Sequence, residues 1–308
     1  MMNMKKSGLL ILALAVAPAS QAKDLRIGVA LANFDLNFIS ILRTQMAKEM
    51  EKEQIQGQFE DAKGDVAVQV QQVENFINQG VDAIILNPVD TQGVKPMMDA
   101  AKRANIPLIF VNRKPEVELS GKMAYVGSDS LLGGRMEMEA LAKRMNYKGN
   151  VAILMGALSA EEARQRTKAT EEVIAKYKEM KVVEKQSAQW MRNEAVDVTS
   201  SWLLSGDKID AIAANNDEMA IGAIMALNQS GKKDILVAGI DGTPDALQFI
   251  KSGKLALTVF QDAAGQGKGA VTMAKQVLDG KNADKFMWIP YQLVTQENYA
   301  EFSAKNVK

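Results

Sequence analysis

The sequence predicts an α/β protein made of two Rossmann-like domains, each with a parallel β-sheet. Short apolar runs alternate with longer segments of helical periodicity along almost the whole chain. The runs are apolar on both faces, as in Ala83-Ile84-Ile85-Leu86, which is typical of parallel strands covered by helices on both sides. The runs are too numerous for one doubly wound sheet, and a length of 308 residues fits two domains better than one.

The first half is expected to begin with a strand over residues 25–31, because this run is rich in Leu, Ile and Val. A helix is predicted over 37–53, a strand near Phe59 and a helix over 66–79. The strand 83–86, the helix 91–104 and the strands 108–111 and 123–126 complete this half.

The same pattern restarts after Gly127. Strands are predicted at 151–155, near Val182, and at 211–214, 235–240 and 255–260. Helices are predicted at 130–145, 162–180, 193–204, 218–229 and 244–252. Gly265-Gln266-Gly267-Lys268-Gly269 is interpreted as the start of a further helix packed closely on its neighbours. It lacks the third glycine of a dinucleotide-binding fingerprint, so we expect no cofactor.

The first 22 residues are typical of a cleavable secretory signal. Lys5 and Lys6 precede an apolar run from Leu9 to Ala17, and Ser20 and Ala22 form a small-x-small cleavage site. The apolar run is too short for a membrane anchor, which needs roughly 20 apolar residues. The sequence therefore predicts export to the periplasm.

Composition excludes several functional classes. The chain has no cysteine and no histidine, which removes disulfides, thiolate ligands, the usual zinc ligand and the usual general base. The 37 basic and 37 acidic residues balance and form no basic patch, so nothing supports nucleic-acid binding. We expect no metal site and no catalytic residue. The alternative that stays open is a carboxylate-based enzyme acting on a carbohydrate.

Polar and aromatic residues gather just after the predicted strands, where parallel sheets place their ligands. Asn and Asp commonly form turns or helix caps, but Arg does not cap a helix N-terminus, so capping is a poorer explanation for Arg113, Arg166, Asn216 and Asp241. Arginine donates, aspartate accepts and asparagine does both, as a hydroxylated ring requires. Phe38 and Trp190 offer aromatic faces for the C–H faces of such a ring.

At these residues the chain resembles the ribose-binding-protein family of periplasmic sugar-binding proteins. The motifs that carry the resemblance are Ala214-Asn215-Asn216-Asp217-Glu218-Met219-Ala220-Ile221-Gly222-Ala223, Ala238-Gly239-Ile240-Asp241-Gly242-Thr243-Pro244-Asp245, Asn87-Pro88-Val89-Asp90, Ala104-Asn105-Ile106-Pro107 and Leu131-Leu132-Gly133-Gly134. The resemblance implies a monomer without cofactor that closes on its ligand and docks to a membrane ABC permease, and in some cases to a chemoreceptor.

The resemblance also implies three crossings between the domains, near Gly127, Gln261-Asp262 and Trp288-Pro290. After the signal, the N-terminal domain is then expected to comprise residues 23–126 and 262–288. The C-terminal domain is expected to comprise residues 127–261 and 289–308.

Carried over position by position, the family's ligand contacts fall on seven residues of this chain. They are Phe38, Arg113, Arg166, Trp190, Asn216, Asp241 and Gln261. The loop after the first strand departs from the family's usual Asn-Pro-Phe-Phe, which adds Asp35 and Asn37 as candidate selectors of the ligand, although Asp35 also suits a turn. The Phe-Asp-x-Asn-Phe pattern is similar to the inositol and rhizopine binders of the family. We therefore rank myo-inositol first as ligand, and ribose or another monosaccharide next.

Overall fold

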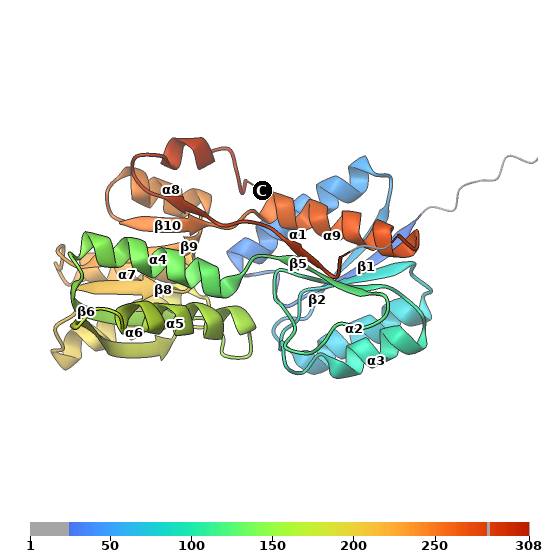
Figure 1. Cartoon of the computed structure of the whole chain (residues 1–308), viewed down its shortest axis with the longest axis horizontal. Coiled ribbons are helices and arrows are strands. Elements are labelled where there is room, and N and C mark those ends of the chain that lie inside the picture. Colours follow the sequence, from blue (N-terminus) through green and yellow to red (C-terminus); the bar gives the residue numbers. More distant parts are fainter. Residues whose placement is uncertain (1–24, 282–283, 308) are drawn as a thin grey trace, which may run out of the picture.

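The computed structural model describes residues 25–281 and 284–307, and the predicted signal, residues 1–22, lies outside them. The chain forms two α/β lobes that lie side by side (Figure 1). Each lobe has a six-stranded, mostly parallel sheet, so the predicted pair of Rossmann-like domains is confirmed, with one strand more in each sheet than the sequence predicts. None of the helices within the described ranges is long and apolar enough to span a bilayer.

The sheet of the first lobe is parallel throughout and has the strand order β11-β5-β4-β3-β1-β2. Its strands are β1 (Arg26–Leu31), β2 (Gln56–Asp61), β3 (Ala83–Leu86), β4 (Leu108–Val111), β5 (Met123–Gly127) and β11 (Phe286–Trp288). The helices α1 (Asn37–Lys52) and α9 (Ala263–Leu278) cover one face, and α2 (Val66–Asn78) and α3 (Lys95–Arg103) cover the other. The four-residue central strands are fully buried, which explains their uninterrupted apolar sequence.

The sheet of the second lobe has the order β12-β10-β9-β8-β6-β7, and only its edge strand β12 runs antiparallel. Its strands are β6 (Lys148–Met155), β7 (Glu179–Ser187), β8 (Ala211–Ala214), β9 (Leu236–Asp241), β10 (Leu257–Phe260) and β12 (Gln292–Val294). The helices α4 (Ser130–Arg144) and α5 (Glu161–Ile174) pack together on one face. The helices α6 (Arg192–Ser205), α7 (Asp217–Gln229) and α8 (Pro244–Lys251) pack on the other face.

Over the described residues the chain passes between the two sheets three times. β5 belongs to the first sheet and leads to α4 on the second, whereas β10 belongs to the second sheet and leads to α9, which packs on α1 of the first lobe. The last passage runs from β11 to β12. Figure 1 shows α9, in orange, beside the blue α1 although more than 200 residues separate them in sequence. The exact domain boundaries stay a prediction.

The structure differs from the sequence-based elements in three places. The predicted helix 162–180 ends at Ile174, because residues from Glu179 onward pair with β6 as β7 and bury Met180. The predicted helix 91–104 begins only at Lys95, because Thr91 hydrogen-bonds to the other lobe. The strands β11 and β12 were not predicted, since each has three residues and gains its pairing from a distant segment.

The predicted close packing at the start of α9 is confirmed at Gly269. A β-carbon at this position would lie 2.8 Å from both Val126 Cγ1 and Met287 Sδ, closer than van der Waals contact allows. The glycine therefore lets α9 approach the first sheet next to the crossings.

We expect Gly269→Val to lower the free energy of unfolding by about 1–3 kcal/mol, because it overpacks this contact. Urea unfolding followed by circular dichroism measures the change. Ala264→Val is the control, since Ala264 is exposed on the same helix and valine there costs only about 0.5 kcal/mol of helix propensity. Equal losses in the two variants would contradict the close-packing role.

Candidate ligand-binding site

A cavity with about 350 Å³ of atom-free space lies between the two lobes at the carboxyl ends of their strands. Such edges are where open parallel sheets bind ligands. The walls of the cavity are Leu36, Asn37, Phe38, Ile39, Asn112, Arg113, Glu162, Arg166, Trp190, Asn216, Asp241 and Gln261.

The structure brings together all but one of the residues that the sequence singled out. Asn37, Phe38, Arg113, Arg166, Trp190, Asn216, Asp241 and Gln261 line the cavity. Asp35 does not: it is exposed, and its backbone N–H donates to Asn33 Oδ1, as in a turn. The sequence analysis missed Leu36, Ile39 and Glu162 as lining residues, and it did not count Asn112 among the ligand contacts. The position of Asn112 directly before Arg113 was a signal that could have identified it. Glu162 offered no such signal, because its sequence context predicts only the first turn of a helix.

Arg166 on α5 is the polar centre of the second-lobe wall. Its guanidinium donates to the Asn215 carbonyl oxygen at 2.6 Å, Gln261 Oε1 at 2.7 Å and Tyr291 Oη at 2.9 Å. Its Nη1 also lies 3.9 Å from Asp241 Oδ1. Burial lowers the pKa of Arg166, but Tyr291, Glu162 and Asp241 raise it by more, so the guanidinium stays charged.

Asp241 ends β9 and presents a carboxylate that accepts no hydrogen bond from the described residues. Burial raises the pKa of this carboxyl well above its usual value, while the Arg166 charge opposes the shift. A buried carboxylate without donors is costly, so this acceptor is poised for a group that brings hydroxyl protons.

Arg113 and Glu162 form a second buried pair across the cavity. Arg113 follows β4 and donates through Nη1 to the Pro88 carbonyl oxygen at 3.0 Å. Its Nε lies 3.3 Å from Glu162 Oε2 on α5, so the pair joins the two lobes, although the hydrogen-bond geometry at Nε is poor. Burial lowers the pKa of Arg113, and Glu162 opposes the shift.

Four lining residues each hold a buried donor nitrogen that has no hydrogen-bond partner of standard geometry among the described residues. They are Asn112 Nδ2, Arg113 Nε, Arg166 Nε and Trp190 Nε1. An unsatisfied buried donor costs about 1–3 kcal/mol, so native structures keep few of them without a reason. A ligand rich in oxygen atoms is the group that satisfies such a set.

Three lining residues have backbone angles in the left-handed or neighbouring positive-φ region. The φ angles of Asn112, Trp190 and Asp241 are 64°, 68° and 134°. Such conformations are costly for residues with a β-carbon, most of all for tryptophan, and they are known to concentrate at ligand sites. Trp190 lies against Gly156, where a β-carbon would come within 2.2 Å of the indole ring. The backbone thus holds these side chains at the cavity.

Asn216 combines two roles that the sequence reasoning treated as competing. It caps α7, because its Oδ1 accepts from the Met219 N–H at 3.0 Å. Its Nδ2 lies 3.3 Å from the Trp190 carbonyl oxygen, and the residue lines the cavity. The expectation that a cap was the poorer explanation for Asn216 is therefore wrong, since the short side chain serves the helix and faces the cavity at once.

Hydrogen bonds join the two lobes directly. Asn37 Nδ2 donates to Glu218 Oε1 at 2.9 Å. Elsewhere the Thr91 N–H donates to the Ser159 carbonyl oxygen at 3.0 Å, and Ser159 Oγ donates to the Val89 carbonyl oxygen at 3.0 Å. The lobes are therefore closed over the cavity in this structure.

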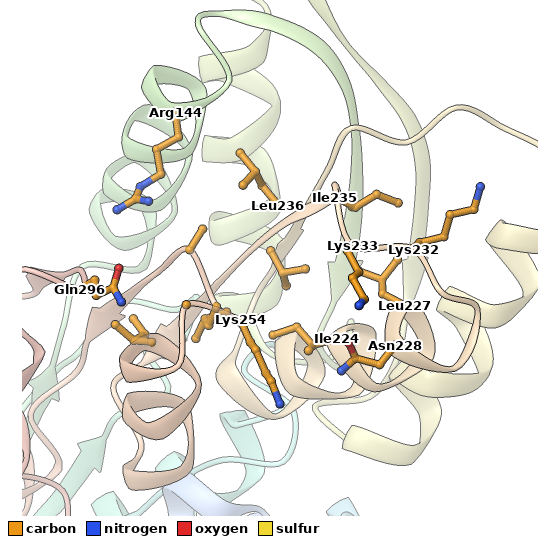
Figure 2. Close-up of a pocket in the computed structure, with 15 residues that line it drawn as sticks. Arg144, Ile224, Leu227, Asn228, Lys232, Lys233, Ile235, Leu236, Lys254 and Gln296 are labelled. Carbon is orange, nitrogen blue, oxygen red and sulfur yellow. The ribbon is translucent and has the colours of Figure 1, made fainter.

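A larger groove, with about 1150 Å³ of atom-free space, lies elsewhere on the second lobe (Figure 2). It sits at the amino ends of β9 and β10, beside Leu236 and Ala256, and exposed side chains such as Lys232, Lys233 and Lys254 rim it. It lacks the buried unpartnered donors of the interdomain cavity. The smaller, interdomain cavity is therefore the candidate ligand site.

Two parallel-sheet lobes closed over a polar cavity define a two-domain solute-binding protein. Among the described residues no group of three or more acidic side chains is arranged to hold a metal ion. The chain belongs to the periplasmic binding protein family, because the model of the periplasmic binding protein domain matches residues 27–282.

Three relatives narrow the class. The protein named "Putative rhizopine-binding protein" of Rhizobium meliloti is 41% identical over 96% of this chain and 98% of its own length. A ribose import binding protein of Bacillus subtilis is 35% identical, over 89% of this chain and 88% of the relative. An ABC transporter solute-binding protein from Bacillus halodurans, solved with bound myo-inositol, is 42% identical with a TM-score of 0.86, over 91% of this chain and 98% of that one. The chain is thus a sugar-binding protein of the ABC-transporter type, and its relatives are solute binders, not enzymes.

A further buried acid is Glu137 on α4, which interacts electrostatically with Arg166 and Asp217. The side chain is fully buried, and neither carboxyl oxygen has a hydrogen bond of standard geometry. Burial raises its pKa from 4.5 to about 8, with Arg166 opposing and Asp217 reinforcing the shift. The folded protein therefore keeps Glu137 protonated at neutral pH, whereas the unfolded chain ionises it.

This difference predicts a pH dependence of stability. Between pH 4.5 and about 8 the folded state binds more protons at Glu137 than the unfolded state, so the free energy of unfolding falls as pH rises through this window. Glu137→Gln should remove that contribution, and its advantage over the parent should grow with pH. Urea unfolding at pH 5, 7 and 8.5 measures it, with Glu172→Gln, half-exposed on α5, as the control. A parent and Glu137→Gln that differ by a constant amount at all pH values would contradict the assignment.

Proposed function

We propose that this protein captures a neutral, polyhydroxylated ring, with myo-inositol as first choice, by closing its two lobes around it. The supporting observation is the cavity itself, whose lining residues include four with buried, unpartnered donors and Asp241, whose carboxylate accepts no hydrogen bond from the described residues. Hydroxyl groups both donate and accept, so a ring that carries them all round satisfies both kinds of group.

The balance of charge favours a neutral ligand. The cavity holds two guanidinium groups and two carboxylates, and each carboxylate has an arginine within 4 Å, Glu162 at 3.3 Å and Asp241 at 3.9 Å. An acidic ligand would bring an uncompensated negative charge into a buried site, and an amine an uncompensated positive one, which is costly. Sugar acids and amino sugars should therefore bind less tightly than uncharged polyols.

A cyclitol is preferred to a pyranose or furanose on two grounds. A cyclitol bears a hydroxyl on every ring carbon, whereas a sugar ring has an oxygen that cannot donate to an acceptor such as Asp241. The relative solved with myo-inositol is also more similar in sequence to this chain than the ribose import binding protein is. Since Asp35 is exposed, we leave it out of the proposed site and assign selection to the cavity walls.

The remaining parts of the proposal concern place and partners. Residues 1–22 are proposed to direct export to the periplasm, where the protein would act as a monomer and deliver its ligand to a membrane ABC permease. A chemoreceptor is a second proposed partner, suggested by the family resemblance.

Calorimetric titration of ligand-free protein with myo-inositol, ribose, glucuronate and glucosamine tests the ligand class. We expect myo-inositol to bind at least about tenfold more tightly than ribose, because a site that pairs hydroxyls rejects a ring lacking one. The two charged ligands should bind more weakly still. Tighter binding of ribose would contradict the cyclitol choice, and failure of every polyol would contradict the proposed function.

Asp241→Asn tests the free carboxylate. Hydrogen bonds to a charged group contribute about 1.5–3 kcal/mol, so the variant should bind the preferred polyol roughly 10- to 100-fold more weakly. Asp35→Asn is the matched control and should bind like the parent, because Asp35 is exposed outside the cavity. A threefold or smaller change in Asp241→Asn would reduce Asp241 to a turn residue.

A further inference from the structure

Asn306, near the C-terminal end of the described chain, is buried at the crossing between β10 and α9. It is 3% exposed, and its φ of 49° is a left-handed conformation that asparagine adopts more readily than most residues. The C-terminal segment ends between the two lobes, beside α1 and α9 (Figure 1). A buried polar residue at this place requires partners.

The side-chain amide of Asn306 binds the backbone of two proposed ligand residues. Its Nδ2 donates to the Asp241 carbonyl oxygen at 2.9 Å and to the Gln261 carbonyl oxygen at 2.7 Å. Asp241 and Gln261 lie side by side at the carboxyl ends of the neighbouring strands β9 and β10. There the Gln261 N–H also donates to the Asp241 carbonyl oxygen at 3.0 Å. Both NH₂ hydrogens of Asn306 are thereby used at the floor of the cavity.

The other end of the same amide reaches the first lobe. Asn306 Oδ1 accepts from the Ala263 N–H at 3.0 Å, and Ala263 is the first residue of α9. This satisfies one of the N–H groups that a helix start leaves unpaired. The next residue in the chain, Val307, accepts at its carbonyl oxygen from Gln45 Nε2 of α1 at 2.7 Å. One side chain therefore links the ends of two second-lobe strands to the start of a first-lobe helix.

We infer that Asn306 is a positioning residue that sets the cavity-facing orientation of Asp241 and Gln261. The φ of 134° at Asp241 is an unfavourable conformation, and the Asn306 bond to its carbonyl helps to fix that peptide. Gln261 Oε1 in turn accepts a hydrogen bond from the Arg166 guanidinium. A shift of the Gln261 backbone would therefore displace this guanidinium, which is the polar centre of the second-lobe wall. This inference rests on the proposed function.

Asn306→Asp tests the inference, because it keeps the shape of the side chain but places an acceptor against two carbonyl oxygens. Asn298→Asp is the matched control: Asn298 binds two backbone groups, Thr295 N and the Leu293 carbonyl oxygen, but neither of these residues lines the cavity, whereas Asp241 and Gln261 do. Both variants should lose stability in urea unfolding. At a temperature where both are folded, only Asn306→Asp should weaken myo-inositol binding, by about tenfold or more, the scale of lost hydrogen bonds at a buried site.

Amide hydrogen exchange provides a readout that needs no ligand. In Asn306→Asp the Gln261 N–H should exchange faster than in the parent, because the new carboxylate repels the Asp241 carbonyl oxygen to which this N–H donates, whereas in Asn298→Asp it should not. If Asn306→Asp does not fold, Asn306→Ser, which keeps one donor, should show an intermediate loss of affinity and protection. Parent-like affinity and exchange in the Asn306 variants would overturn the inference. A parent that binds no polyol would instead contradict the proposed function, while the exchange data would still decide the role of Asn306.

Discussion

The buried guanidinium of Arg166 is the interaction on which the rest of the site depends. A charge removed from water must be surrounded by acceptors, and here those acceptors come from four different segments: Asn215 after β8, Asp241 at the end of β9, Gln261 after β10 and Tyr291 beyond the last crossing. The packing around it leaves little freedom, since a β-carbon at Gly134 of α4 would lie 2.5 Å from the Arg166 carbonyl oxygen. One side chain therefore fixes the relative positions of the strand ends that form the wall.

The site is held in an unfavourable state by a well-packed scaffold. The unpartnered donors and positive φ angles of Trp190 and Asn112 each cost free energy. Burying the Asp241 carboxylate costs free energy as well, as its raised pKa indicates. The sheets and their covering helices supply the stability that offsets this cost, because their central strands are buried on both faces. A ligand that pairs with the donors and the carboxylate would form the hydrogen bonds that the folded protein alone does not make, and their free energy would contribute to binding.

Much of the fold was readable from the sequence because it depends on local patterns. Runs such as Ala211–Ala214 stand out by composition, and the structure places a strand over the same residues. The short strands β11 and β12 lack such a pattern, since pairing with distant segments creates them. Part of the candidate site could be predicted from the sequence, because polar residues that follow parallel strands come together at the same edge of the sheet. Glu162 and Asn306 were missed for the same reason: their roles arise from neighbours more than 40 residues away, which spacing along the chain does not reveal.

Some of the direct hydrogen bonds between the lobes stabilise the closed form through residues other than those that line the cavity. Thr91 and Ser159 contact each other without lining the cavity, so they favour the closed form equally for any ligand. Asp241 and Trp190 line the cavity, and in the proposed function they discriminate between ligands. Under the proposed function, overall affinity and selectivity are thus controlled by different residues. A lineage adapting to scarcer or more abundant nutrient can retune the first through rim substitutions and still recognise the same molecule.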